Sequence, residues 1–193
     1  MTTGDLEALV RVTAPGYVGE TPPDVAFGTT DSPVGPLALA VTARGVAACS
    51  YENEHVVFAR VSREIGSFIG PDPRRLDPVR RELDAYFAGR LRAFSVLVDL
   101  RLATPFARTV LQMTMAIPYG SVTTHQEIAD RIGRPQALRA VGNALTANPV
   151  CVIVPCHRAV EAPGRPGGYA GGPAAKEHLL RLEEAEYGRP RNV

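Results

Sequence analysis

The sequence predicts an α+β protein in which a small mixed domain precedes a mostly helical one. In the first half, short apolar runs alternate with Gly- and Pro-containing turns, and two amphipathic segments follow them. In the second half, capping residues and Pro mark the starts of several short helices. Hydrophobic residues make up 45% of the 193 residues, which is enough for a packed core.

Composition narrows the function classes. No apolar run approaches the ~18–20 residues of a membrane span, and the N-terminal residues MTTGDLEALV lack the pattern of a secretory signal. The three cysteines, an odd number, argue against a disulfide scaffold and indicate a reducing, cytoplasmic location. Residues 104–193 carry 10 basic and 7 acidic side chains, net +3, against net −2 for residues 1–103. This asymmetry permits a phosphate-binding surface on the second half without requiring one.

The N-terminal half is expected to begin with a flexible arm, residues 1–23, and to continue as an α+β domain over residues 24–100. Three apolar runs separated by turns predict an antiparallel meander, with strands at 25–29, 36–42 and 45–50. Helices are expected over 54–65 and 77–87, the second with Asp77 as N-cap and Pro78 at its first position. Asp72-Pro73 is expected to be a break before that helix, and residues 94–98 a closing strand.

The second half, residues 104–186, is expected to be helical, with a tail at 187–193. Thr104-Pro105 combines a capping residue with a first-turn Pro and predicts a helix that ends at Pro118. Two short helices, 124–131 and 136–146, flank a tight Gly-containing turn, which is typical of a helix-turn-helix. An extended apolar run, a Gly/Pro-rich loop and a last helix are expected at 150–154, 162–173 and 174–186.

The most specific chemical feature is the Cys156-His157 pair. A thiol becomes a good nucleophile when it ionises, and a neighbouring imidazole favours ionisation as a base or as a stabilising cation. A carboxylate commonly fixes the useful imidazole tautomer, and the last helix offers Glu177, Glu183, Glu184 and Glu186. Taken alone, the pair also fits a buried cysteine beside a surface histidine. No metal site is expected, because no CxxC or HxxxH spacing occurs.

The other two cysteines have simpler interpretations. Cys49 lies in an apolar run and is expected to be a small core residue. Cys151 precedes Cys156 by five residues in the extended run. Because odd spacing along a strand places side chains on opposite faces, Cys151 is expected to lie outside the pocket of Cys156.

Several motifs together carry a family resemblance. The second half contains IPYG at 117–120, RAVG at 139–142, NP at 148–149, IVPCHR at 153–158 and YAGG at 169–172, and the first half contains DSPVGPLALA at 31–40. Over about residues 24–186 the chain resembles the O6-alkylguanine-DNA alkyltransferases, or methylated-DNA–protein-cysteine methyltransferases. The resemblance implies an RNase-H-like α/β N-terminal domain and a C-terminal domain with a winged helix-turn-helix. It also implies one SN2 transfer of an alkyl group from guanine O6 to cysteine, with no cofactor and no regeneration.

The resemblance also assigns roles to residues. Cys156 would be the acceptor, His157 a base acting through a water, and Glu183 the group that orients His157. Asn148 would hold the turn between the recognition helix and the active-site segment. Arg139 would replace the nucleotide that is flipped out of the duplex, since a stacked base cannot present O6 to a buried thiol. The recognition helix would enter the minor groove with Ala137, Leu138, Ala140 and Gly142, and the substrate pocket would include His125, Arg158, Ala159, Tyr169 and Ala170.

The sequence departs from the family pattern in four places. His125 stands where tyrosine is usual as a donor to guanine N3, and Ala170 stands where serine is common. Leu138 is bulkier than the usual neighbour of the inserted arginine, and the chain contains no tryptophan. Alkyltransferase-like relatives lack the acceptor cysteine, which this chain keeps.

The expected partner is double-stranded DNA containing O6-alkylguanine, bound by a monomer. Two other functions stay open on the sequence alone. The first is a non-catalytic DNA-lesion binder or transcription regulator on the same fold. The second is a thiol hydrolase that uses Cys156, His157 and Glu183.

Overall fold

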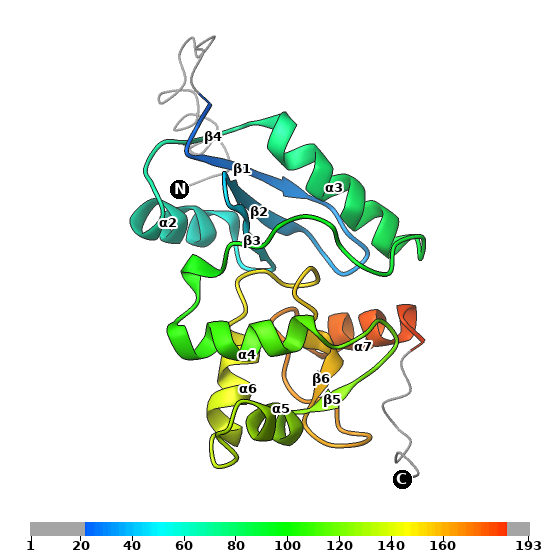
Figure 1. Ribbon diagram of the computed structural model, residues 1–193. Coiled ribbons are helices and arrows are strands. Elements are labelled where there is room, and N and C mark those ends of the chain that lie inside the picture. The colour runs from blue at the N-terminus through cyan, green and yellow to red at the C-terminus, as the bar shows by residue number, and fades with distance from the viewer. Residues whose placement is uncertain (1–21, 185–193) are drawn as a thin grey trace.

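The computed structural model describes residues 22–184, which form an upper sheet domain and a lower helical domain (Figure 1). The α+β class expected from the sequence, with the sheet domain first, is confirmed. Nearly all of the expected arm, and the whole of the expected tail at 187–193, lie outside the described residues.

The N-terminal sheet has the order β3-β2-β1-β4. Strands β1 (Val25–Thr30), β2 (Leu37–Thr42) and β3 (Gly45–Ser50) form the predicted antiparallel meander, with Val25 opposite Thr42 in the first pair. Strand β4 (Ile69–Gly70) pairs in parallel with β1 and was not predicted. Two residues are too few to show the alternation by which a strand is recognised.

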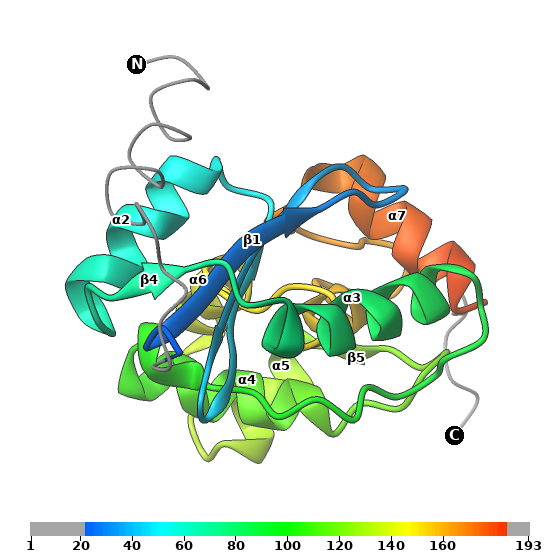
Figure 2. The same cartoon turned by 90° about the horizontal axis from the view of Figure 1, so that it is seen from above.

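Two helices cover opposite faces of this sheet, α2 (Glu54–Glu64) and α3 (Pro73–Phe87), so that β1 runs between them when seen from above (Figure 2). Every residue of β2 is buried because both faces are covered. The two faces differ in side-chain size, since β2 turns alanines toward α2 and larger aliphatic residues toward α3.

Two predictions for this domain are wrong. Helix α3 begins one turn earlier than expected, because Asp72 accepts a hydrogen bond from the Arg74 backbone N–H and Pro73 takes the first helical position. Pro78 therefore lies inside the helix, which forgoes one backbone hydrogen bond there. Residues 94–98 form no strand, and only Val98 makes an isolated bridge, to Val46.

The C-terminal domain contains α4 (Pro105–Met115), α5 (His125–Arg131), α6 (Leu138–Thr146) and α7 (Gly172–Leu182), and the short 3-10 turn η1 (Leu100–Leu102) precedes it. Strand β5 (Thr123–Thr124) pairs with β6 (Ala159–Val160) beside the helix-turn-helix that α5 and α6 form. Thr124 caps α5 as predicted, in a reciprocal capping box with Glu127. Helix α6 begins two residues later than expected, and α7 begins two residues earlier and ends at Leu182.

The two domains share one hydrophobic core. The cluster runs from Leu39 and Cys49 of the sheet to Leu111 of α4. It also includes Val150 and Cys151, which follow α6. Backbone hydrogen bonds reinforce the junction, from Cys49 N–H to the Pro149 carbonyl at 2.9 Å and from Cys151 N–H to the Cys49 carbonyl at 2.8 Å. Within residues 22–184, no helix combines the length and apolar character needed to cross a membrane.

Candidate active site

The site is organised around a compact turn that follows α6. Asn148 is buried, and its Oδ1 accepts a hydrogen bond from Val150 N–H at 2.9 Å. Its Nδ2 donates to the Val154 carbonyl at 3.1 Å and to Cys156 Sγ at 3.1 Å. One amide therefore closes the turn and also touches the candidate nucleophile.

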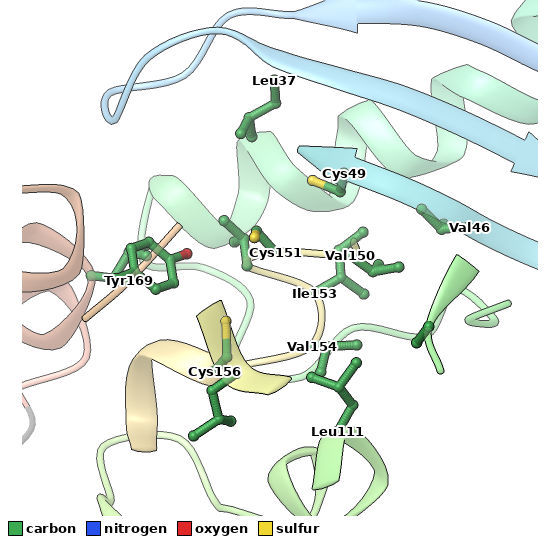
Figure 3. Close-up of a cluster of buried hydrophobic side chains, with 14 of the residues drawn as sticks. Leu37, Val46, Cys49, Leu111, Val150, Cys151, Ile153, Val154, Cys156 and Tyr169 are labelled. Carbon is green, nitrogen blue, oxygen red and sulfur yellow. The ribbon is translucent and has the colours of Figure 1, made fainter. Parts of the chain in front are cut away.

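Residues 150–154 do not form the expected extended segment. Val154 N–H bonds to the Val150 carbonyl at 2.9 Å, and Val152 has a φ of 70°, a left-handed conformation that is a marked outlier for a β-branched residue. Alternation fails across this turn, so the prediction that Cys151 faces away from Cys156 is wrong. Figure 3 shows the Cys151 side chain between those of Cys49 and Cys156.

Cys156 begins the 3-10 turn η2 (Cys156–Arg158) and is only 2% exposed. Burial opposes ionisation, but hydrogen bonds from the Cys151 thiol and the Asn148 amide, with the positive charge of Lys176, lower the pKa of Cys156 below its usual value. The same contact and burial raise the pKa of Cys151. Cys151 is therefore protonated, and its thiol also donates to the Asn148 carbonyl at 3.3 Å. Cys156 is the more readily ionised sulfur.

Lys176 of α7 is buried close to this site. Its Nζ donates to the Ala159 carbonyl at 2.6 Å and to the Gly168 carbonyl at 3.4 Å. Burial lowers the pKa of Lys176 to about 8. At neutral pH its charge favours the thiolate form of Cys156.

His157 points into a buried hydrogen-bond network on the other side of η2. Its Nε2 lies 2.9 Å from Glu183 Oε1, and both side chains are fully buried. Burial lowers the pKa of His157 despite the carboxylate, so the ring is neutral at pH 7 and Nε2 carries the proton that it donates. The His157 Nδ1 has no partner within the described residues and is left as a proton acceptor.

Glu183 is the centre of that network. Arg158 donates from Nε to Oε2 and from Nη2 to Oε1, each at 2.9 Å, and Gly120 N–H donates to Oε2 at 3.3 Å. Tyr86 of α3 donates its hydroxyl to Oε1 at 2.6 Å. Burial alone would favour the neutral acid, but the hydrogen bonds from His157 and Arg158 lower the pKa of Glu183 to about 2.

A cavity beside Asn148 is lined by residues of both domains. The cavity has a volume of about 320 Å³ and lies between Asn148 and the loop before α7. Tyr169 is buried at its wall, Ala170 is exposed, and the Tyr51 hydroxyl lies 3.2 Å from that of Tyr169. A Cβ on Gly171 would lie 2.7 Å from the Tyr51 ring, so only glycine fits there. The N-terminal residues that line this cavity, which the sequence gave no reason to select, are Ser50, Tyr51, Glu52 and Arg60.

His125 is buried and does not lie on the protein surface. It is 9% exposed at the start of α5, with Gly142 of α6 and Gly167 of the loop alongside. Burial lowers the pKa of the ring, and Nε2 has no partner within residues 22–184. Nε2 can therefore accept a hydrogen bond when it lacks the proton and donate one when it carries it.

The expected DNA face lies on α6 and the turn before it. Leu138 is 43% exposed, and Arg139 and Ala140 are exposed beside it. Ala137 and Gly142 are half-buried. The Arg139 side chain makes no hydrogen bond or ion pair with any part of the chain that the structure describes. Its side chain is therefore available to an external partner.

Most of the predicted residues fall into two groups in space. One group lies around the Cys156 sulfur and the Glu183 carboxylate and contains Asn148, Cys156, His157, Arg158, Glu183 and Tyr169. The other, at the start of α6, exposes Leu138, Arg139 and Ala140 to solvent. Among residues 22–184, no three His, Cys, Asp or Glu side chains converge as metal ligands would.

Comparison with known proteins places both domains in one family. The family described as 6-O-methylguanine DNA methyltransferase, ribonuclease-like domain, matches residues 25–100. The family described as 6-O-methylguanine DNA methyltransferase, DNA binding domain, matches residues 105–185.

Individual relatives match most of the chain. A methylated-DNA–protein-cysteine methyltransferase of Mycobacterium tuberculosis (strain H37Rv) is 40% identical over 164 residues, which cover 82% of this chain and 92% of that protein. A protein of the same name from Methanosarcina barkeri is 39% identical over 163 residues, covering 82% and 96%. The crystal structure of Mycobacterium tuberculosis OGT in complex with DNA has a TM-score of 0.70 and 40% identity, covering 83% of this chain and 93% of that one.

Proposed function

The chain belongs to the 6-O-methylguanine DNA methyltransferase family, and we propose from that premise that Cys156 accepts the alkyl group removed from O6 of guanine in duplex DNA. It is a direct-reversal repair protein that binds DNA. The observation that carries the choice of acceptor is the setting of Cys156, a buried sulfur that receives a hydrogen bond from the Asn148 amide at 3.1 Å and whose pKa is lowered.

The reaction is one displacement. The Cys156 sulfur bonds to the alkyl carbon as the bond from that carbon to O6 breaks, and guanine leaves with the electron pair. The thiol proton passes to Nδ1 of His157 through a water. The guanine anion takes one proton from water, and the proton on His157 is released to water in turn. The products are an S-alkylcysteine and guanine, so each protein molecule acts once.

The surrounding residues support this chemistry in distinct ways. Glu183 holds Nε2 of His157 protonated, which leaves Nδ1 as the basic nitrogen. Tyr169 and Ala170 form a wall for the flipped base, and Arg139 fills the gap that the base leaves in the stack. One chain supplies all of these residues, which favours action as a monomer. A thiolate acceptor favours a reducing, cytoplasmic location.

The test is incubation with a duplex oligonucleotide that contains one O6-methylguanine, followed by intact-protein mass spectrometry and peptide mapping. We expect one added methyl group per protein, located on Cys156. Cys156→Ser should gain none and should still bind the duplex, since affinity comes mainly from phosphate and groove contacts. Methyl on Cys49 or Cys151 would overturn the assignment of the acceptor. Binding without transfer would indicate a lesion binder, and turnover of esters or amides a hydrolase.

A further inference from the structure

One hydroxyl of the N-terminal domain reaches the catalytic carboxylate. Tyr86 lies on α3 and is fully buried. Its hydroxyl donates to Glu183 Oε1 at 2.6 Å and lies 3.4 Å from His157 Nε2. Its ring packs against Phe94 and Tyr119, at centroid separations of 5.2 Å and 6.3 Å. The contact therefore joins the ribonuclease-like domain to the proposed base of the reaction.

The hydroxyl competes with the histidine for one oxygen. Oε1 of Glu183 accepts from Tyr86, His157 and Arg158, and Oε2 accepts from Arg158 and Gly120. An ionised carboxylate has about four lone-pair sites, so five donors saturate it. Each donor weakens the carboxylate as an acceptor for the others. The hydrogen bond from His157 is therefore weaker than it would be without the Tyr86 hydroxyl.

We propose that Tyr86 is a positioning residue for alkyl transfer, which acts through Glu183 to fix the orientation of His157 and to limit how strongly that carboxylate retains an imidazolium proton. This inference rests on the proposed function, because it assigns Tyr86 to the base of that reaction. It requires no contact between Tyr86 and DNA or guanine.

The direction of the effect follows from the network. An imidazolium is stabilised by a carboxylate that has few other donors, and it must lose its proton before Nδ1 can accept the one from Cys156. Removing the hydroxyl should make His157 hold its proton to higher pH. The titratable and charged groups that face His157 are Glu183 and Lys176 from the last helix and its end, Cys156 and Arg158 from its own turn, Tyr86 from α3 and Tyr169 from the loop.

The test compares Tyr86→Phe with Tyr119→Phe. Tyr119→Phe is a matched control, because it also loses one hydroxyl near the end of α7, but that hydroxyl donates to the Leu182 carbonyl at 3.1 Å. Single-turnover methyl transfer is measured from pH 5 to 9, together with duplex affinity and the histidine titration of the free protein by 15N NMR.

For Tyr86→Phe we expect the acid limb of the rate profile and the His157 titration to move to higher pH by on the order of 1 unit. On that limb the rate falls by about tenfold at a given pH, while the duplex affinity stays unchanged. Tyr119→Phe should move neither. Equal profiles and titrations for both variants, or a shift to lower pH, would overturn the proposal.

Two features keep this test decisive. The titration is read on the free protein, so it reports on Tyr86 even if the protein fails to transfer alkyl groups. If Tyr86→Phe does not fold, a fluorinated tyrosine at position 86 keeps the ring and donates more strongly. That change should move the limb and the titration to lower pH, and an unchanged titration would count against the proposal.

Discussion

Replacing Glu183 by glutamine should produce a loss of stability whose size depends on pH. The hydrogen bonds from His157 and Arg158 lower the pKa of Glu183 from 4.5 to about 2. At about 1.4 kcal/mol per unit, that shift corresponds to about 3 kcal/mol of folding free energy. The contribution is fully present above the unfolded pKa near 4.5 and is lost as the pH falls toward 2.

Glu183→Gln also leaves a buried cation without its anion. Arg158 is 7% exposed, and its guanidinium would keep its hydrogen bond to the Ile117 carbonyl at 2.6 Å but would lose the negative charge that it faces. Removing one partner of a buried ion pair costs about 3–5 kcal/mol. We therefore expect the variant to be less stable than the natural chain by about 3–5 kcal/mol at pH 7. Most of that difference should disappear as the pH falls from 4.5 toward 2.

Urea unfolding at several pH values between 7 and 3 measures this difference. The chain has no tryptophan, so circular dichroism is the suitable signal. Glu184→Gln is the matched control, because Glu184 is the exposed neighbour, and its stability should follow that of the natural chain at every pH. A difference for Glu183→Gln that stays constant from pH 7 to pH 3, or that is absent at pH 7, would refute the reasoning.

Three further variants test other parts of the site. Arg139→Ala should slow repair of duplex DNA much more than dealkylation of the free base, because only the duplex needs a side chain in the vacated stack, and an equal loss on both substrates would contradict that role. Cys151→Ala should raise the pKa of Cys156 by removing a donor, so alkylation by iodoacetamide should need higher pH, whereas Cys49→Ala should leave that profile in place. Burial lowers the pKa of the His125 ring, so the imidazolium that can donate forms only below about pH 6.5. We expect the natural chain to transfer the alkyl group faster than His125→Tyr only in that pH range, and superimposable pH profiles would exclude a donor role for His125.

The sequence predicted elements whose signals are local. The meander strands are apolar runs bounded by turn residues, and the Thr124 capping box marks the start of α5 within four residues. The start of α3 was misplaced because Asp72-Pro73 and Asp77-Pro78 offer the same cap-and-Pro signal one turn apart. Pattern alone does not decide between two such starts.

The parts of the site that were missed depend on contacts between distant segments. Nothing near Tyr86 in sequence indicates that its hydroxyl meets Glu183, which lies 97 residues further along the chain. The position of Cys151 was wrong because a valine, Val152, takes a left-handed conformation, and no sequence rule assigns that conformation to a β-branched residue. The candidate nucleophile Cys156 and its neighbour His157 could be proposed from the sequence because they are adjacent in it.

The pairing of β3 with the active-site turn has a consequence for self-association. β3 is one of the two outer strands of the sheet, and unpaired backbone on such a strand can template the addition of a foreign strand. Here Val46 is bonded to Leu97 and Asp99, and Cys49 to Pro149 and Cys151. The segment that leads to Cys156 thus also covers part of the β3 edge, which protects it from pairing with another chain. In a fragment that ends before residue 104, the Cys49 N–H and carbonyl would lose their hydrogen-bond partners Pro149 and Cys151. The isolated sheet domain should therefore be prone to form strand-paired oligomers.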